Sequence, residues 1–563
     1  MPDNDGTFRP GISKQALLGY AAVFVSFLII FAVPLWDIDL WWHLATGRYI
    51  VEHRSLLAAD PFSYTSGHDS SLRAIILNGY WLSQVILYQA HSVFGNYGII
   101  AFRVLVLISI LFMVLRIGRR LGAEDPALII VLVMTGFVSR RFTGERPQLF
   151  SFLLAPVVFY LLNDLKEAYS AQRIASSEQQ EEAYSVKRVA SMGQQKEASG
   201  VQHNTPYTLH PSRLSHNVTR CPLPPARYFL LPLTMLLWAN LHRGFMMGTA
   251  LIALFGVSET VRLYLKRGID KPFLKGCLIM AVAISASFIN PNTYKPYLEL
   301  IVFQASALQQ RTSEYLSPVT LMLHRQYLVS YWLYLTASAI VFGLSSRRMD
   351  KTNLLIFVFL AALSLSAFRY IPFFVFVTAP YVALYLSDIL KIPLPPNGRG
   401  EKKGTLYFAR PISVLAALLV IATFMFMLKS FDSTLGSALR HPTMARRFPE
   451  KAASFIEEHH LPGRIFNHFN WGGYLIWRLY PERRVFIDGR ALSLKAFSDY
   501  TEILWDKDKW KALLGYYGVR VIVMPRSNPL TGELYELINR LYEDPDWALV
   551  YSDDTAMVFL NRQ

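Results

Sequence analysis

The chain has 563 residues, of which 53% are hydrophobic and 17% charged, and its mean hydropathy is +0.27. Ordinary soluble domains carry about 25% charged residues, so this composition excludes a disordered or fibrous protein and disfavours a purely soluble one. The two cysteines, Cys221 and Cys277, exclude a disulfide framework and a cysteine-rich metal site. The net charge of +16 suggests nucleic acid in a soluble protein, but basic cytoplasmic loops in a membrane protein.

Apolar segments dominate the first 430 residues. A spanning helix needs about 20 mostly apolar residues, and about eleven segments qualify as candidates: 15–34, 97–115, 126–139, 148–163, 228–240, 245–261, 273–289, 327–344, 353–367, 371–388 and 411–429. No small-residue cleavage site follows the first of them, so we expect an uncleaved anchor. The sequence therefore predicts a polytopic α-helical membrane protein.

Basic residues gather in alternate loops, which predicts the orientation. With a cytoplasmic N-terminus, the inner loops contain Arg116, Arg119, Arg120, Lys266, Arg267, Lys271, Lys275, Arg347, Arg348, Lys351, Lys391, Arg399, Lys402, Lys403 and Arg410. This is the positive-inside pattern. It explains the basic excess without a nucleic-acid partner, and it predicts an external C-terminus.

Three long segments connect or follow the spans. The external loop 35–96 follows the first span, and 164–226 forms a cytoplasmic insert rich in Ser, Gln, Glu and Pro. The insert lacks apolar periodicity and is predicted to be disordered. We therefore divide the chain into a transmembrane domain over 1–429 and an external (periplasmic) domain over 430–563.

The external domain is predicted to be an α/β fold. Short β-branched runs at 464–466, 484–488 and 519–525 alternate with helical patterns at 449–459, 472–480 and 507–516, and the last residues suggest a hairpin. The domain has no glycine-rich phosphate loop, so nothing in it indicates nucleotide binding.

Acidic residues follow the first span. Asp37 and Asp39 stand two apart, and Asp39 shares a face with His43 if a helix begins there. Asp39 could instead serve as a helix N-cap, with the neighbouring tryptophans as an interfacial belt. Further external connections contribute Asn290 and Glu314, as candidate residues for the acceptor or for another role in the site.

Basic residues also stand on the external side, against the charge rule. They are Arg140, Arg141, Arg146, His242, Arg243 and Arg369. The flanking apolar runs are short, which places the connecting turns below the outer surface. These residues predict a recessed cationic site for a phosphate, most of all Arg369 and Arg146 beside proline-marked bends. The alternative is snorkelling to lipid headgroups.

The combined pattern predicts chemistry on a lipid-borne substrate. Basic residues suit the phosphate of a lipid-linked donor, and a nearby carboxylate suits a general base for an acceptor hydroxyl. Paired acids can also hold a divalent cation such as Mg²⁺ or Mn²⁺, with Asp37, Asp39 and His242 as its candidate ligands; the sequence leaves open whether a metal is bound.

The topology and the Asp-bearing first external loop, DIDLWWHL, resemble the GT-C superfamily of polyprenyl-phosphate-sugar-dependent membrane glycosyltransferases. The resemblance covers most of residues 15–430. It implies that Asp37 is the catalytic aspartate of the first external loop and the candidate general base, with Asp39 as the second candidate. It also implies an inverting displacement at the anomeric carbon, in which the lipid phosphate leaves.

The segment FNWGGYLIWRLYPERRVFIDGR, 469–490, distantly resembles the region around the WWDYG signature of oligosaccharyltransferase catalytic subunits. Trp471, Gly473, Tyr474 and Asp488 correspond in order, which makes Trp471, Tyr474 and Asp488 candidate acceptor-side residues. The second Trp and the Asp of the signature are missing, and Gly472 stands there instead. Protein N-glycosylation is therefore not implied, and a buried aromatic core is the alternative.

We therefore expect an inner-membrane, GT-C-like glycosyltransferase that transfers a sugar from a polyprenyl-phosphate-linked donor to an external glycan, lipid or protein acceptor of the cell envelope. One alternative is a transporter or flippase for a lipid-linked or anionic solute, which predicts internal repeats and a polar path through the bilayer. Another is a non-catalytic scaffold that retains the fold.

Overall fold

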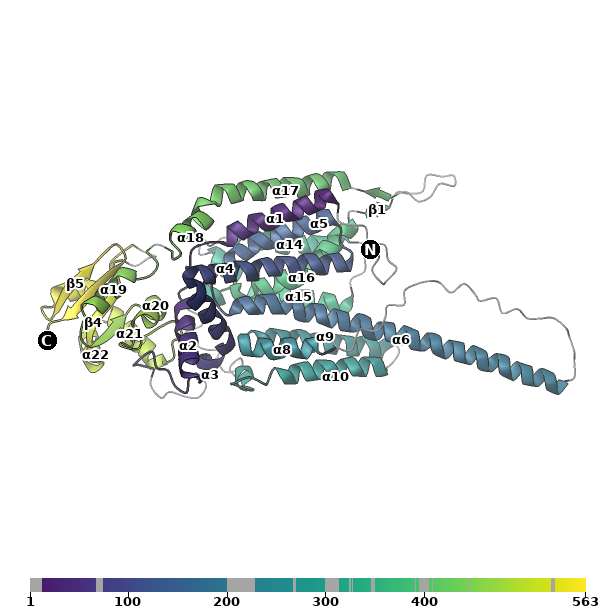
Figure 1. Ribbon diagram of the computed structural model, residues 1–563, viewed down its shortest axis with the longest axis horizontal. Helices are drawn as coiled ribbons and strands as arrows, with labels where there is room; N and C mark the ends of the chain where they lie inside the picture. The colour runs from purple at the N-terminus through teal and green to yellow at the C-terminus, as the bar shows by residue number, and fades with distance from the viewer. Residues whose placement is uncertain are drawn as a thin grey trace.

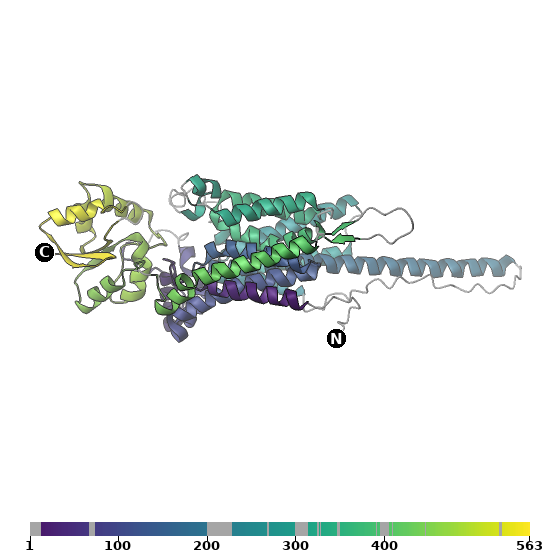
Figure 2. The same cartoon turned by 90° about the horizontal axis from the view of Figure 1, so that it is seen from above.

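The computed structural model describes residues 13–66, 74–199, 228–266, 270–298, 313–323, 326, 328–345, 350–389, 391–393, 405–407, 409–444, 446–527 and 532–563. A long helical bundle occupies the centre, and a smaller α/β domain lies at one end of it (Figure 1). The view from above shows the same two parts in line (Figure 2).

Each apolar segment predicted as a span coincides with a helix. These helices are α1 (Lys14–Phe31), α4 (Trp81–Leu121), α5 (Asp125–Ser139), α6 (Gln148–Ser199), α8 (Leu230–Leu241), α9 (Phe245–Lys266), α10 (Lys271–Ala286), α14 (Val329–Leu344), α15 (Lys351–Ser366), α16 (Ile371–Ile389) and α17 (Ala409–Ser430). Within the described residues, six helices are long and apolar enough to cross a membrane, and α8, α14 and α15 are shorter apolar helices. The predicted number of eleven spans is thus not confirmed.

The core of the bundle forms around α16. Nearly every residue of α16 is buried, and it packs against α4, α5, α6, α14 and α15. A helix that is apolar all round belongs in the interior, whereas α17 lies at the edge and exposes residues such as Leu418 and Met425. These exposed apolar side chains are expected on a surface that faces lipid.

The structure corrects one prediction at the end of the bundle away from the α/β domain. Residues 164–226 were predicted to be disordered, but α6 continues as one helix to Ser199 and projects beyond the bundle (Figure 1). The prediction is therefore wrong over 164–199. This stretch is rich in Ala, Glu and Gln, which favour a helix even where the sequence has no sustained apolar face. Residues 200–226, with Cys221, lie outside the described part of the chain.

Short elements close the end of the bundle that faces the α/β domain. They are α2 (Leu40–His53), α3 (Ala74–Asn78), η1 (Arg140–Phe142), η2 (Ser313–Tyr315), α13 (Pro318–Leu323), η3 (Phe368–Tyr370), η4 (Asp432–Gly436) and α18 (Ser437–Arg440). The long helix α4 is kinked here at Gly95, whose φ is +59°. A small hairpin of β1 (Lys391–Pro393) and β2 (Thr405–Tyr407) lies at the opposite end.

The C-terminal domain is built on a four-stranded sheet of order β3-β4-β6-β5. Its elements are α19 (Glu450–Glu458), β3 (Arg464–Asn467), η5 (Phe469–Trp471), α20 (Gly472–Leu479), α21 (Leu494–Trp505), α22 (Trp510–Tyr516), β4 (Val519–Pro525), α23 (Glu536–Glu543), β5 (Trp547–Ser552) and β6 (Ala556–Asn561). The pair β3–β4 is parallel, and β6 pairs antiparallel with β4 and β5, as the predicted hairpin requires.

The predicted strand at 484–488 is not a strand. Val485 makes an isolated bridge with Ser63 of the loop before α3, and the Asn467 side chain accepts the backbone N–H groups of Phe486 and Ile487. An asparagine side chain thus takes the hydrogen bonds that a neighbouring strand would otherwise provide. Residues 484–488 therefore lie between the sheet and the loop before α3 and add no strand to the sheet.

The loop after α1 and the C-terminal domain share one apolar core. Trp41 and Leu44 of α2 are buried in the same cluster as Leu475 of α20 and Val521 of β4. The backbone of Leu35 also exchanges hydrogen bonds of 2.8 Å with Pro442 and Met444. The C-terminal domain is therefore docked onto the end of the bundle through apolar contacts and main-chain hydrogen bonds.

Candidate active site

Three carboxylates meet one guanidinium between the bundle and the docked domain. Arg146, just before α6, places Nε 2.6 Å from Asp37 Oδ2 and Nη1 3.1 Å from Asp39 Oδ2. The same Nη1 lies 2.6 Å from Glu314 Oε1 on η2. The loop after α1, the α5–α6 turn and η2 therefore converge on one cluster, which we call the carboxylate cluster (Asp37, Asp39, Arg146 and Glu314).

Asp37 is held from several sides and is 1% exposed. Its Oδ1 accepts the backbone N–H of Asp39 at 2.9 Å, and its own N–H donates to Glu145 Oε2 at 3.1 Å. Glu145 forms a fully buried ion pair with Arg103 of α4, which also donates to the carbonyl of Val33. Buried charges are tolerated when they are paired and hydrogen-bonded. The Arg103–Glu145 pair therefore holds the backbone of Asp37 in place beneath the cluster.

Two glycines cover the aspartates with bare backbone. A Cβ built on Gly144 would overlap Asp37 Oδ2, and one built on Gly489 would overlap Asp39 Oδ1. Such close approach requires a residue without a side chain. Because Gly489 belongs to the C-terminal domain, that domain forms part of the wall of the carboxylate cluster.

The two aspartates differ in exposure and in charge environment. Asp39 is 20% exposed, and its Oδ1 accepts from Trp42 Nε1 at 3.2 Å. Burial raises the pKa of Asp39 to about 6; Arg146 opposes the rise, and the charges of Asp37 and Glu314 add to it. The same three acids outweigh burial at Arg146 and hold its pKa well above the ordinary value, so Arg146 stays protonated.

The two histidines predicted as site residues lie on either side of one tyrosine ring. The ring of Tyr80 is 5.3 Å from His43 and 5.4 Å from His242, measured between centroids. His43 Nδ1 contacts Gln84, whereas His242 Nδ1 accepts the N–H of Gly244 and lies 2.6 Å from Ser151 Oγ. Burial and nearby arginines lower the pKa of both histidines well below the ordinary value, so both rings are neutral.

The structure separates the predicted phosphate-binding residues into three environments. Arg146 is engaged by the carboxylates. Arg369 on η3 lies 4.6 Å from the ring of Tyr315, next to Glu314, and Arg243 lies 5.8 Å from the ring of Tyr80. Arg140 and Arg141 are exposed, and Arg140 lies over Phe426 of α17.

Most of the predicted acceptor-side residues contact other parts of the protein and lie outside the carboxylate cluster. Asn290 donates to the carbonyls of Ser287 and Thr293 after α10. Trp471 donates its N–H to the Arg447 carbonyl. Tyr474 is buried between Trp41, at 5.0 Å, and Phe448, at 5.3 Å.

Asp488 is the exception, since it adjoins the cluster through Gly489. It binds Arg490 through both of its oxygens at 2.7 Å, and Arg490 also contacts Asp60 at 2.8 Å. All three side chains are buried. Burial alone would raise the pKa of Asp60, but Arg490 outweighs it and the pKa is lowered. This network ties the loop before α3 to the segment that covers Asp39.

The donor set of the cluster bears on the predicted divalent cation. Carboxylate oxygens suit Mg²⁺ or Mn²⁺, but the guanidinium of Arg146 stands between the three carboxylates and contacts each of them. His242 Nδ1 is occupied by Gly244 and Ser151. Over the described residues, no group of three His, Cys, Asp or Glu side chains is placed to hold one ion. As arranged, these residues do not fit a divalent cation at Asp37, Asp39 and His242.

Sequence reasoning missed several residues of this site. Arg103 stands in the apolar run of α4, and an ionisable residue within a span is by itself a reason to expect function. Glu145 adjoins Arg146 in the sequence but was not singled out. Gly489 and Arg490 carried no local signal, because their importance depends on the docking of a domain some 450 residues further along the chain than Asp39.

Comparison with known proteins gives no match by sequence but a clear match by fold. No family model and no curated protein sequence matches the chain. The oligosaccharyltransferase of Archaeoglobus fulgidus, in its apo form, matches with a TM-score of 0.56 at 11% identity, over 90% of this chain and 69% of that one. ArnT from Cupriavidus metallidurans bound to undecaprenyl phosphate matches with a TM-score of 0.52 at 12% identity, over 96% and 97%.

A third structure is the mycobacterial arabinofuranosyltransferase AftD, with a TM-score of 0.54 at 14% identity. The alignment covers 97% of this chain but 41% of AftD. All of these are GT-C glycosyltransferases. The chain therefore has the GT-C fold, as the resemblance implied, and its apolar helices make it a multi-pass membrane protein.

Proposed function

We propose that the chain is a membrane glycosyltransferase that transfers a sugar from a polyprenyl-phosphate-linked donor to an external acceptor. The observation that carries this proposal is the carboxylate cluster at the docked end of a GT-C bundle. Among its structural neighbours, one oligosaccharyltransferase is in complex with a dolichol-phosphate and ArnT is bound to undecaprenyl phosphate. A lipid phosphate is thus the ligand chemistry that this fold accommodates elsewhere.

The exposure of the aspartates supports a division of roles between them. Asp39 reaches the surface and has a pKa near 6, which suits a general base working close to neutral pH. Asp37, the acid that the family resemblance singles out, is enclosed and holds both Arg146 and the backbone of Asp39. We therefore place proton transfer at Asp39 and positioning at Asp37, with Asp37 as base the alternative.

The reaction follows from this assignment. The acceptor hydroxyl gives its proton to Asp39, the acceptor oxygen attacks the anomeric carbon, and the bond between that carbon and the lipid phosphate breaks. The configuration inverts because there is one displacement. The leaving phosphate gains negative charge, which a guanidinium stabilises. Arg369 is the residue we assign to it, because its guanidinium lies over Tyr315 beside the cluster and, among the described residues, forms no ion pair with a carboxylate.

The orientation in the membrane is part of the proposal. The basic loops favour a cytoplasmic N-terminus, and the C-terminal domain lies at the end of the bundle opposite to the projecting part of α6 (Figure 1). An inner membrane with this domain outside satisfies both observations. In intact cells, a membrane-impermeant thiol reagent should label Ser527→Cys. Protection of that cysteine, or labelling of Cys221 from outside, would reverse the topology.

The function is tested in a deletion strain by mass spectrometry of surface glycans and glycoproteins. Wild type should restore a glycan that Asp39→Asn does not restore. Asp432→Asn is the matched control, because Asp432 is exposed at the end of the bundle and pairs with Arg440 only at the surface. Full restoration by Asp39→Asn and Asp37→Asn alike would favour the scaffold alternative.

A further inference from the structure

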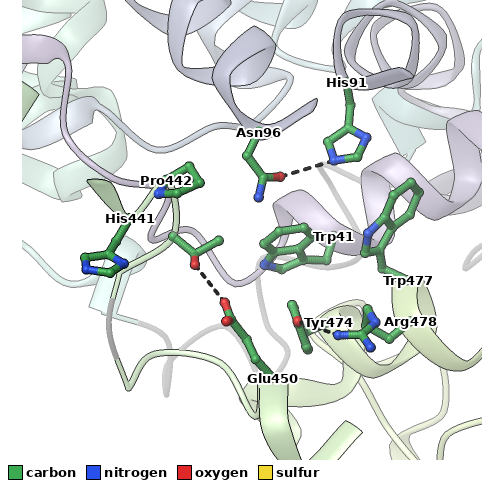
Figure 3. Close-up of a pocket in the computed structure, with 10 residues that line it drawn as sticks. Trp41, His91, Asn96, His441, Pro442, Glu450, Tyr474, Trp477 and Arg478 are labelled. Carbon is green, nitrogen blue, oxygen red and sulfur yellow. Dashed lines mark hydrogen bonds between the residues drawn. The ribbon is translucent and has the colours of Figure 1, made fainter. Parts of the chain in front are cut away.

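A separate pocket lies beside α2, at Trp41. It has a volume of about 390 Å³ and shares no lining residue with the cluster. Its walls come from α2, from both arms of the kinked helix α4, from the linker after α18 and from α19 and α20 (Figure 3). The volume is within the range of about 300–1,000 Å³ that is typical of ligand pockets.

Aromatic rings and planar polar groups both line the pocket. Trp41, Tyr474 and Trp477 supply the rings, and Glu450, Arg478 and Asn96 supply the polar groups (Figure 3). The apolar C–H face of a sugar ring packs on an aromatic ring, while its hydroxyls need paired donors and acceptors such as carboxylate, amide and guanidinium. The lining therefore suits a polyhydroxylated ligand.

The charge balance argues against an anion. The guanidinium of Arg478 is already neutralised by Glu457 at 2.7 Å, and it also donates to the Tyr474 hydroxyl at 3.2 Å. Glu450 adds a negative charge at the rim, where its Oε1 accepts from Thr443 at 2.7 Å. A phosphate would meet the Glu450 carboxylate, and among the described lining residues no lysine or arginine besides Arg478 could offset its charge; a neutral saccharide needs no such cation.

One donor in the wall is left without a partner. Trp41 is 2% exposed, and its Nε1 has no hydrogen-bond acceptor among the described residues. Figure 3 shows this nitrogen on the side of the ring that faces Glu450. The neighbouring indoles of Trp42 and Trp471 both have acceptors. Buried donors are nearly always satisfied, so a ligand oxygen is the natural partner for Trp41.

We propose that this pocket binds a saccharide that belongs to the acceptor, so that the acceptor of the proposed glycosyltransferase is itself a glycan. That the saccharide is an acceptor rests on the proposed function. Saccharide binding itself can be tested without any transfer reaction. Consecutive residues of α2 link the two sites, because Trp41 lines the pocket while Trp42 donates to Asp39 Oδ1. A glycan held at Trp41 would thus lie next to the indole of Trp42, which contacts the proposed base Asp39.

The test measures binding of saccharides to the full-length protein in lipid nanodiscs by saturation-transfer NMR. Nanodiscs are needed because alkyl maltoside detergents themselves carry a saccharide. The probes are glucose, galactose, mannose, rhamnose and arabinose with their common disaccharides, and inorganic phosphate as the anionic probe. A glycolipid with the best disaccharide as its headgroup, placed in the same nanodiscs, distinguishes a lipid-borne glycan from a soluble one.

We expect Trp477→Ala to weaken saccharide binding at least about tenfold through loss of a stacking ring. Glu450→Gln should weaken it less and leaves the fold undisturbed, because Glu450 is exposed. Trp505→Ala is the matched control, since Trp505 is an exposed indole on α21 of the same domain. Asp39→Asn should bind saccharide normally even if it abolishes transfer, which separates failure of the pocket from failure of the proposed function.

Binding of no probe saccharide would overturn the proposal, and so would binding that both pocket substitutions leave unchanged. Binding of inorganic phosphate in place of sugar would assign the pocket to an anion.

Discussion

The backbone of Gly489 lies so close to Asp39 that a Cβ at position 489 would overlap Asp39 Oδ1. Gly489 is part of the C-terminal domain, and Arg490 of the buried pair Asp488–Arg490 on either side of it is bound to Asp60 of the loop before α3. The domain therefore shapes the surroundings of the proposed base directly.

We expect Gly489→Ala to lower transfer by pushing Asp39 away from Arg146, while the protein remains folded. The comparison is with Gly515→Ala on α22, where an added Cβ meets nothing within 4 Å. Transfer rate and melting temperature should be measured on both. Equal rates in the two variants would mean that the domain does not constrain Asp39.

Asp39→Asn should reduce kcat by about 10²–10⁴-fold, the usual contribution of a positioned general base, with little change in melting temperature. Asp37→Asn should reduce both, because it removes the enclosed partner of Arg146 and an acceptor for the N–H of Asp39. Purified proteins should be compared by single-turnover transfer and by thermal unfolding. If Asp37→Asn is stable but inactive while Asp39→Asn is active, Asp37 is the general base and Asp39 the positioning residue.

The pH dependence of transfer should report on Asp39. Its pKa of about 6 means that the carboxylate is ionised above that pH and protonated below it. Transfer should therefore rise with pH through about 6 and then level. Glu314→Gln should move this step to lower pH, since the charge of Glu314 helps to raise the pKa of Asp39. A step that is unchanged in Glu314→Gln would assign the titration to another group.

The sequence predicted the helices of the bundle well because their apolar runs are continuous, including the shorter ones. It also placed Asp37, Asp39, Arg146 and Glu314 on one side of the bundle, which is where they meet. Topology alone brings these residues to the same end of the molecule. Topology does not determine which of them are in contact. Arg146 was predicted to bind phosphate, but in the structure it contacts three carboxylates.

Features that depend on tertiary contacts could not be predicted from the sequence. The continuation of α6 to Ser199 has helix-forming composition, but beyond Tyr169 its sequence has no sustained apolar periodicity to indicate a helix. The segment 484–488 has the β-branched residues of a strand, yet the Asn467 side chain takes its backbone N–H groups. In this second case local propensity is overridden, because the deciding partner is distant in the sequence.

Removal of metal offers a sharp test of Arg146. Because its guanidinium already contacts all three carboxylates, we expect transfer to persist in EDTA and Mn²⁺ not to bind at the cluster. Arg146→Ala leaves three carboxylates without a cation and should gain Mn²⁺ binding, detected by electron paramagnetic resonance. Loss of wild-type transfer in EDTA, restored by Mg²⁺, would mean that a metal displaces Arg146 during the reaction.

Arg369 is the residue that we expect to bind the donor phosphate. A guanidinium near the membrane is costly unless a partner offsets its charge. Among the described residues, the rings of Tyr315 and Tyr370 lie against the guanidinium of Arg369, at 4.6 and 6.0 Å. Arg369→Gln should weaken binding of undecaprenyl phosphate by about tenfold or more, since a charge-assisted hydrogen bond contributes about 1.5–3 kcal/mol. Binding should be measured with a fluorescent polyprenyl phosphate in nanodiscs. Arg140→Gln is the control for snorkelling, because Arg140 is exposed and lies over Phe426 of α17, outside the cluster. Equal affinities in Arg369→Gln, Arg140→Gln and wild type would remove Arg369 from the phosphate site and leave its contact with Tyr315 as a structural one.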